Sequence, residues 1–246
     1  MRAGAPSWRG GARWNCLGAE VGGAITLASP LDGFTFDAYR SPPSDARRGG
    51  VIVIQEIFGV TDHIREIADG FAADGYEAIA PSLFDRRQRK FEAGYESAGV
   101  ERGRTLSERT PWDEVAGDLA ACVGELAPPV FVVGYCWGGS AAWLAACRCE
   151  GVSAVSSYYG RRIPELVAEP PRCPVILHFG RHDASIPQGM VEAIAVAHPE
   201  IPIHLYDAGH GFASDRGADY HPDAARLARL RTLALFARNG AGRGDF

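Results

Sequence analysis

The sequence predicts an α/β protein with a mostly parallel central sheet and helices on both faces. Short apolar runs rich in β-branched residues, such as residues 51–55 and 130–133, alternate with amphipathic segments along the chain. This alternation is typical of βαβ units. The runs are apolar throughout, which indicates strands buried on both faces of the sheet. With no internal repeat, we expect one domain over residues 23–246.

Composition excludes several classes of protein. The chain has 246 residues, 46% hydrophobic and 22% charged, with a net charge of −5. These values are typical of a soluble globular protein and argue against a nucleic-acid partner. No apolar run approaches the roughly 20 residues that span a bilayer, and no apolar signal core follows the first arginines. We therefore expect a cytoplasmic protein without a membrane partner.

The first third of the chain contains a predicted tail, three predicted strands and one predicted helix. Residues 1–22 show no periodicity and predict a disordered tail. Alternation over residues 34–39 predicts an exposed-edge hairpin strand, and residues 51–55 form the first buried strand. An amphipathic helix begins at Thr61-Asp62, and residues 75–81 form the next strand.

Residues 83–110 differ from their surroundings because they carry many charges and no strong helix or strand period. Two interpretations stay open: a loop or cap over a site, or a solvated surface excursion. A helix then follows from Pro111 to Leu126, since proline and acidic residues suit a helix N-terminus. The remaining elements are strands at 152–159, 175–180 and 203–206 and helices at 188–197 and 222–238.

Residues 130–142 carry the strongest chemical signal. An apolar strand runs into Gly134-x-Cys136-x-Gly138-Gly139 and then into an alanine-rich helical segment. A reactive side chain between glycines at a strand–turn–helix junction predicts a nucleophile elbow. The positive end of the helix would favour a thiolate there. The alternative is a buried structural cysteine in a glycine-rich turn.

The other cysteines indicate neither disulfides nor a metal site. They are spread through apparent strands and helices, and the spacing of Cys147-x-Cys149 does not match a metal-binding pattern. We expect buried free thiols, no metal and no cofactor.

Four chemical groups fall at the carboxyl edge of the predicted sheet, where ligands bind in such folds. They are Glu56, Cys136, Asp183 and His210. Three follow the order nucleophile, acid, histidine, which belongs to the α/β-hydrolase fold. Cys136 would attack a carbonyl carbon, His210 would move protons, and Asp183 would orient the imidazole. In the alternative interpretation His210 is a surface residue and Asp183 caps a turn.

Two backbone N–H groups are candidates for an oxyanion hole. One belongs to Trp137, directly after the cysteine, and the other to Ile57, after the strand that carries Glu56. Both would bind the negative oxygen that forms when a nucleophile attacks a carbonyl.

These residues resemble the dienelactone hydrolases, also called carboxymethylenebutenolidases, over roughly residues 23–238. The resemblance is carried by four short segments: Gln55-Glu56-Ile57-Phe58-Gly59, Gly134-Tyr135-Cys136-Trp137-Gly138-Gly139, Gly180-Arg181-His182-Asp183 and Gly209-His210-Gly211-Phe212. It implies an α/β-hydrolase fold and a Cys-His-Asp triad in which a glutamate, here Glu56, contacts the resting thiol until substrate displaces it. It also implies opening of an anionic enol lactone to maleylacetate in the degradation of aromatic compounds.

The resemblance also implies cationic substrate-binding residues. The segment ending in Arg86 matches the one that supplies one family arginine. The second family position is Ser214 here, with Arg216 two residues further on. Tyr158 is the candidate pocket tyrosine, and a buried structural role for it stays open. The expected partner is therefore a small anionic lactone or ester, and the chain would act as a monomer or homodimer.

Other functions remain compatible with these residues. A carboxylesterase or thioesterase of broader specificity would use the same groups. A non-catalytic small-molecule receptor on a hydrolase scaffold would not need all four polar groups. A redox-sensing thiol protein would react with peroxide without hydrolysing esters.

Overall fold

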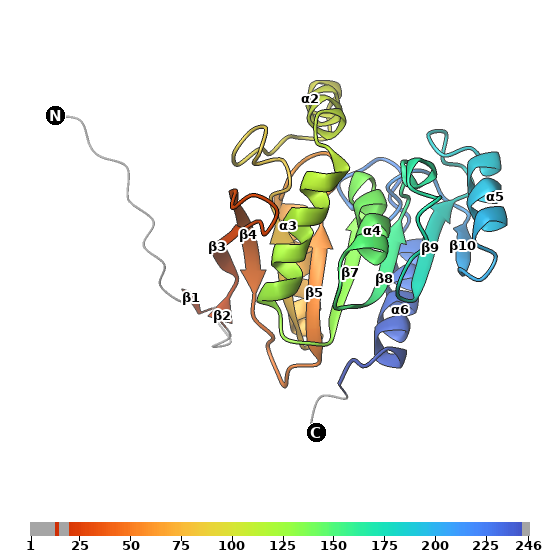
Figure 1. Cartoon of the computed structure of the whole chain (residues 1–246). Helices are drawn as coiled ribbons and strands as arrows, with labels where there is room; N and C mark the ends of the chain where they lie inside the picture. Colours follow the sequence, from red (N-terminus) through yellow and green to blue (C-terminus); the bar gives the residue numbers. More distant parts are fainter. Residues whose placement is uncertain (1–12, 15–19, 243–246) are drawn as a thin grey trace.

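The computed structural model describes residues 13–14 and 20–242 (Figure 1). Its strands are β1 (Arg13–Trp14), β2 (Glu20–Val21), β3 (Gly23–Ala28), β4 (Thr35–Ser41), β5 (Gly49–Ile54), β6 (Tyr76–Pro81), β7 (Val130–Tyr135), β8 (Val152–Tyr158), β9 (Val175–Gly180) and β10 (Ile203–Tyr206). Its helices are α1 (Asp62–Ala73), α2 (Ser97–Glu108), α3 (Trp112–Glu125), α4 (Trp137–Arg148), α5 (Gln188–Ala197) and α6 (Pro222–Arg238), with a 3-10 turn η1 (Ile163–Glu165).

Eight strands form the central sheet in the order β10-β9-β8-β7-β5-β6-β4-β3. Strands β5 to β10 run parallel, and β3 and β4 are antiparallel to their neighbours. This confirms the predicted mostly parallel α/β fold. The strand predicted at the exposed edge, residues 34–39, corresponds to β4 but does not lie at the edge. Strand β4 pairs with both β3 and β6, so β3 forms the edge.

Helices cover both faces of the sheet. Figure 1 shows α3 and α4 on one face of the sheet and α6 on the other. Helix α1 lies beside α6, because its Phe71 ring contacts that of Phe236. The rings of Phe71, Tyr76, Phe131 and Phe236 join α1, β6, β7 and α6, with centroids 4.4–6.2 Å apart. Each such buried ring stabilises the fold by roughly 1.5–3 kcal/mol. No helix among residues 13–14 and 20–242 is long and apolar enough to cross a membrane.

The predicted tail, residues 1–22, lies mostly outside the described residues. Within it, β1 and β2 pair antiparallel, with Arg13 opposite Val21 and Trp14 opposite Glu20. These four residues are strand residues, and the prediction for the rest of the tail lies outside the described residues.

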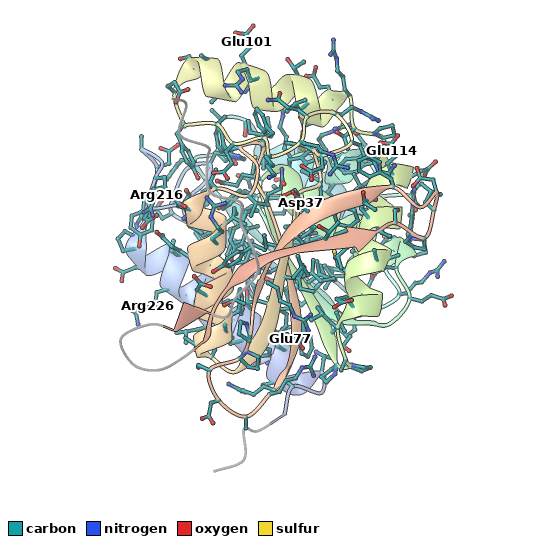
Figure 2. The ribbon with its side chains drawn as sticks, turned by 90° about the vertical axis from the view of Figure 1, so that its left-hand side faces the viewer. Asp37, Glu77, Glu101, Glu114, Arg216 and Arg226 are labelled. Carbon is teal, nitrogen blue, oxygen red and sulfur yellow. The ribbon has the colours of Figure 1, made fainter. Side chains whose placement is uncertain are left out.

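The charged segment 83–110 contains a helix that the sequence pattern did not reveal, α2. Figure 2 shows α2 with Glu101 at one end of the molecule and Glu77, near the start of β6, toward the other. Gly103 allows its close approach, because a Cβ there would lie 2.2 Å from the Ile57 carbonyl oxygen. The helix therefore lies beyond the carboxyl ends of the strands, beside the predicted site.

Candidate active site

The four predicted chemical groups line one cleft at the carboxyl ends of the strands. Glu56 follows β5, Cys136 follows β7, Asp183 follows β9 and His210 follows β10. The cleft has a volume of about 1220 Å³, and all four residues line it. Parallel strands end at the same sheet edge, so residues more than 150 positions apart meet there.

Cys136 lies at a tight turn between β7 and α4, with φ 56° and ψ −118°. This positive φ is strained for a residue with a side chain and costs about 1–3 kcal/mol. The surrounding glycines make the turn possible. A Cβ on Gly134 would lie 1.9 Å from the Gly138 carbonyl oxygen, and one on Gly138 would lie 2.3 Å from that of Gln55. The turn exposes the sulfur to the cleft.

A continuous line of hydrogen bonds joins Cys136, His210 and Asp183. Nε2 of His210 lies 3.3 Å from Sγ of Cys136, and Nδ1 lies 2.6 Å from Oδ2 of Asp183. The other oxygen of Asp183 accepts hydrogen bonds from the backbone N–H groups of Ser185 and Ile186, at 2.8 and 3.1 Å. These contacts fix the carboxylate, which in turn fixes the imidazole.

Burial and neighbouring groups shift the pKa values of Asp183 and His210. Burial alone would raise the pKa of Asp183, but its hydrogen bond to His210 and the charge of that imidazole lower it. Burial alone would lower the pKa of His210. The charge of the Cys136 sulfur and the contact with Asp183 outweigh burial and raise it to about 10. These contacts favour an imidazolium beside the ionised carboxylate of Asp183.

Glu56 has a different partner from the one that the resemblance implied. Its side chain is buried, and the Tyr95 hydroxyl donates a hydrogen bond to its Oε2 at 2.7 Å. Burial raises the pKa of Glu56, and the Tyr95 bond and the charges of His63 and His210 oppose this. In the described part of the chain, His210 and not Glu56 is hydrogen-bonded to the Cys136 sulfur. Sequence reasoning missed Tyr95 because its segment has no periodic pattern.

Both candidate oxyanion donors line the cleft. Trp137 is the first residue of α4, where the backbone N–H has no intrahelical partner. Ile57 follows β5, beside the strand that leads to Cys136. The role of these two N–H groups as oxyanion donors stays a prediction.

Comparison with known proteins identifies the group to which the chain belongs. The model of the dienelactone hydrolase family matches residues 36–240. The chain belongs to the dienelactone hydrolase family. As a member of this family it is an enzyme, a hydrolase that acts on ester or lactone bonds.

Individual relatives agree with the family assignment. A protein of Synechocystis sp., provisionally named a carboxymethylenebutenolidase, is 36% identical over 76% of this chain and 84% of its own. A carboxymethylenebutenolidase of a Pseudomonas species is 31% identical over 84% and 91%. A crystal structure from Klebsiella pneumoniae, provisionally named a dienelactone hydrolase, is 30% identical, with a TM-score of 0.76 over 88% and 99%.

Two predicted substrate-binding residues do not reach the cleft of this dienelactone hydrolase family member. The Arg86 side chain is only 6% exposed and forms ion pairs with Asp32 and Asp118, at 2.7 and 2.8 Å. Tyr158 is buried, and its hydroxyl lies 2.8 Å from that of Thr232 in α6. The expectations for these side chains are corrected because Arg86 turns toward α3 and Tyr158 packs under α6.

Other cations lie at the cleft. Arg216 lines it and pairs with Glu66 and Asp215 at 2.6 and 2.8 Å, and its predicted role in substrate binding stays a prediction. Arg104 of α2 and Arg161 also line it, and sequence reasoning missed both. Within residues 13–14 and 20–242, the side chains of these two arginines form no hydrogen bond or ion pair. They are therefore available to an anionic ligand.

One group of side chains has donor atoms close enough for a metal ion. Ligand atoms of His63, Glu66 and Asp215 lie within 4.8 Å of one another. Arg216 bridges the two carboxylates and already compensates their charge. The predicted reaction needs no metal, and we assign none to this group.

Proposed function

We propose that the chain opens enol lactones through Cys136, with His210 and Asp183 completing a catalytic triad. The sulfur, its proton held by His210, attacks the carbonyl carbon, and the N–H groups of Ile57 and Trp137 bind the oxyanion. The carbon–oxygen bond of the ring then breaks, and the enol oxygen takes the proton from His210. Water, deprotonated by His210, attacks the thioester and releases the acid and the thiol.

A single geometric observation carries this proposal. The Cys136 sulfur lies 3.3 Å from an imidazole nitrogen whose other nitrogen lies 2.6 Å from a buried carboxylate. This is the distance and order that proton transfer from a nucleophile requires. The Cys136 sulfur faces the cleft and is open to oxidation, which argues against a purely structural role for this cysteine.

The proposed substrate is an enol lactone that bears a carboxylate, such as dienelactone, which would yield maleylacetate. The name of the Pseudomonas relative supports this class. An enol is a good leaving group, so modest proton donation by His210 is sufficient. Arg104 and Arg161, which line the cleft without partners among the described residues, are the proposed cations for the substrate carboxylate.

A second candidate is hydrolysis of small neutral esters by the same groups. This candidate is favoured by the two positions at which the resemblance implied substrate-binding arginines. Arg86 is held in a buried ion pair, and Ser214, at the second position, carries no charge. An enzyme without either cation would select less strongly for an anion.

A panel of lactones and esters tests the proposal. The purified protein is assayed with dienelactone, a neutral enol lactone and p-nitrophenyl acetate, beside Cys136→Ala and Cys136→Ser. We expect hydrolysis of dienelactone at the highest kcat/KM and a loss of at least about a thousandfold in both variants. Equal kcat/KM for neutral and anionic substrates favours the second candidate. Activity that survives in Cys136→Ala overturns the mechanism.

A further inference from the structure

Tyr159 has a strained backbone beside the candidate active site. It directly follows β8 and has φ 39°, a left-handed value that is unfavourable for a residue with a side chain. Its N–H donates a hydrogen bond to the carbonyl of His178 in β9 at 2.7 Å. The carbonyl of the preceding residue, Tyr158, accepts a hydrogen bond from the N–H of Cys136 at 3.0 Å. These contacts hold the strained residue next to the turn that carries Cys136.

The hydroxyl group of Tyr159 does not explain why a tyrosine stands at this position. The side chain is fully buried, and its oxygen has no hydrogen-bond partner among the described residues. A buried hydroxyl without a partner destabilises a fold. Burial raises the pKa of this hydroxyl well above its ordinary value, and nearby negative charges, including that of the Cys136 sulfur, act in the same direction. The ring therefore stays neutral, and the aromatic ring is the useful part of the side chain.

The ring of Tyr159 packs against the imidazole of His210. The two ring centroids lie 5.1 Å apart, and the planes are inclined by 60°, an edge-to-face arrangement. Phe212 also packs against the tyrosine ring, with centroids 5.3 Å apart and planes at 75°. The face of an aromatic ring attracts a cation within about 6 Å of its centroid, and the attraction is stronger where water is excluded. Protonated His210 is such a cation.

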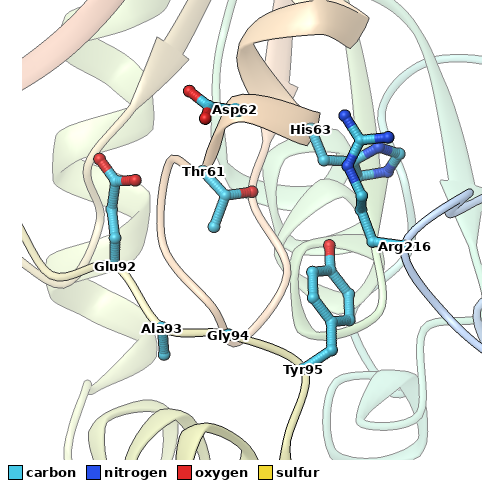
Figure 3. Close-up of a pocket in the computed structure, with 8 residues that line it drawn as sticks. All are labelled: Thr61, Asp62, His63, Glu92, Ala93, Gly94, Tyr95 and Arg216. Atoms are coloured by element: carbon cyan, nitrogen blue, oxygen red, sulfur yellow. The ribbon is translucent and has the colours of Figure 1, made fainter.

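Other charged groups also act on the imidazole of His210. Acidic groups lie around it at the ends of several strands and in its own loop: Cys136, Asp183, Glu56 and Asp219. Two basic side chains lie further along the cleft. Figure 3 shows them, His63 and Arg216, at the same side of a smaller hollow of about 360 Å³, where both pair with Asp215. All these groups are kept when only the ring of Tyr159 is exchanged, so a changed titration of His210 then reports on that ring.

We propose that the ring of Tyr159 positions the imidazole of His210 and stabilises its protonated form, the state in which His210 holds the proton of the Cys136 sulfur. Tyr159 is a positioning residue that acts through His210, because it is buried and stands outside the set of described residues that line the cleft. The inference rests on the proposed role of His210 as the group that moves protons.

Titration of the His210 imidazole by NMR tests this inference without any substrate. The resonance is assigned by its loss in His210→Ala. Tyr159→Leu keeps an apolar side chain and removes the aromatic face, so the midpoint should fall by about one pH unit, a tenfold change in proton affinity. A ring that only filled space would not give this sign, because water that entered the vacated volume would stabilise the imidazolium. Tyr159→Phe keeps the aromatic face and should keep the midpoint of the native enzyme.

The matched control is Tyr76→Leu at the start of β6. Tyr76 is likewise fully buried, and its hydroxyl also has no hydrogen-bond partner among the described residues. Its ring packs against those of Phe131 and Phe236 instead of an imidazole. This variant creates a similar cavity and should leave the His210 midpoint unchanged. Tyr159→Met, with a longer apolar side chain, repeats the test if Tyr159→Leu does not fold.

Three outcomes overturn the inference. They are an unchanged or raised midpoint in Tyr159→Leu, an equal decrease in Tyr76→Leu, and an equal decrease in Tyr159→Phe, which would assign the effect to the hydroxyl. The decrease caused by Tyr159→Leu should persist in the Cys136→Ala background, because the ring contact does not involve the sulfur. A lack of lactone hydrolysis would count against the proposed function alone, since these measurements use no substrate.

Discussion

Oγ of Ser185 lies 3.1 Å from Nδ1 of His210, on the same nitrogen that contacts Asp183. The same hydroxyl donates to Oδ1 of Asp183 at 2.6 Å. The Ser185 hydroxyl thus contacts both the carboxylate of Asp183 and the imidazole of His210. A serine two residues after an aspartate forms such local contacts readily, which is the only signal in the sequence that could have found it.

Replacing Ser185 by alanine should reduce kcat moderately. The variant loses one hydrogen bond to Asp183, while the N–H groups of Ser185 and Ile186 still hold that carboxylate. One hydrogen bond of about 0.5–1.5 kcal/mol corresponds to a decrease of roughly twofold to tenfold. Steady-state kinetics with p-nitrophenyl acetate measures it. A decrease as large as that of His210→Ala would contradict this account.

The ionisation of His210 should depend on the cysteine. The charge of the Cys136 sulfur and the contact with Asp183 raise the pKa of His210 to about 10, against burial, which lowers it. In Cys136→Ala the raising effect of the sulfur is lost, so the pKa should move down. Titration of the imidazole by NMR measures the change. An unchanged midpoint would show that the sulfur does not influence the ring.

The turn that carries Cys136 should not accept a side chain at Gly134. A Cβ there would lie 1.9 Å from the carbonyl oxygen of Gly138, an overlap that the backbone of α4 must relieve. Gly134→Ala should lower the free energy of unfolding by about 3 kcal/mol or more. The matched control is Gly189→Ala in α5, where no atom lies within 4 Å; it should gain about 0.5–1 kcal/mol. Urea denaturation compares the two, and equal stability of both variants would contradict the geometry.

Arg86 should stabilise the fold rather than recognise substrate. In Arg86→Met, the carboxylate of Asp118, 2% exposed, loses its partner. Breaking a buried pair in this way costs about 3–5 kcal/mol. We expect a lower melting temperature and an unchanged ratio of kcat/KM between anionic and neutral substrates. A selective loss with anionic lactones would return Arg86 to the substrate site.

Arg161 and Arg104 should carry the preference for an anion. Replacing either by glutamine should lower kcat/KM for an anionic lactone about tenfold or more, because a charged hydrogen bond is worth about 1.5–3 kcal/mol. Neutral esters should change less than about twofold. Arg226→Gln on α6, an exposed arginine away from the cleft (Figure 2), is the matched control. If all three variants behave alike with both substrates, the anion is bound elsewhere.

The fold could be predicted from the sequence because its strands are short, apolar and separated by amphipathic helices. The predicted helices at 188–197 and 222–238 coincide with α5 and α6. Helix α2 was missed, since two glycines and many charges hide its period, and Gly103 is there to approach the Ile57 carbonyl. The periodicity of one segment does not predict its contact with a segment that lies far away in the sequence.

The sequence by itself determined which residues stand at strand ends: Glu56, Cys136, Asp183 and His210 all follow predicted strands, and the parallel sheet brings strand ends together. Only the tertiary structure decided where long side chains point. Arg86 pairs with Asp118, and Glu56 accepts a hydrogen bond from Tyr95. A buried charged group needs such a partner, and the packing of the fold decides which partner lies within reach. That choice depends on contacts across the fold, which no spacing along the chain specifies.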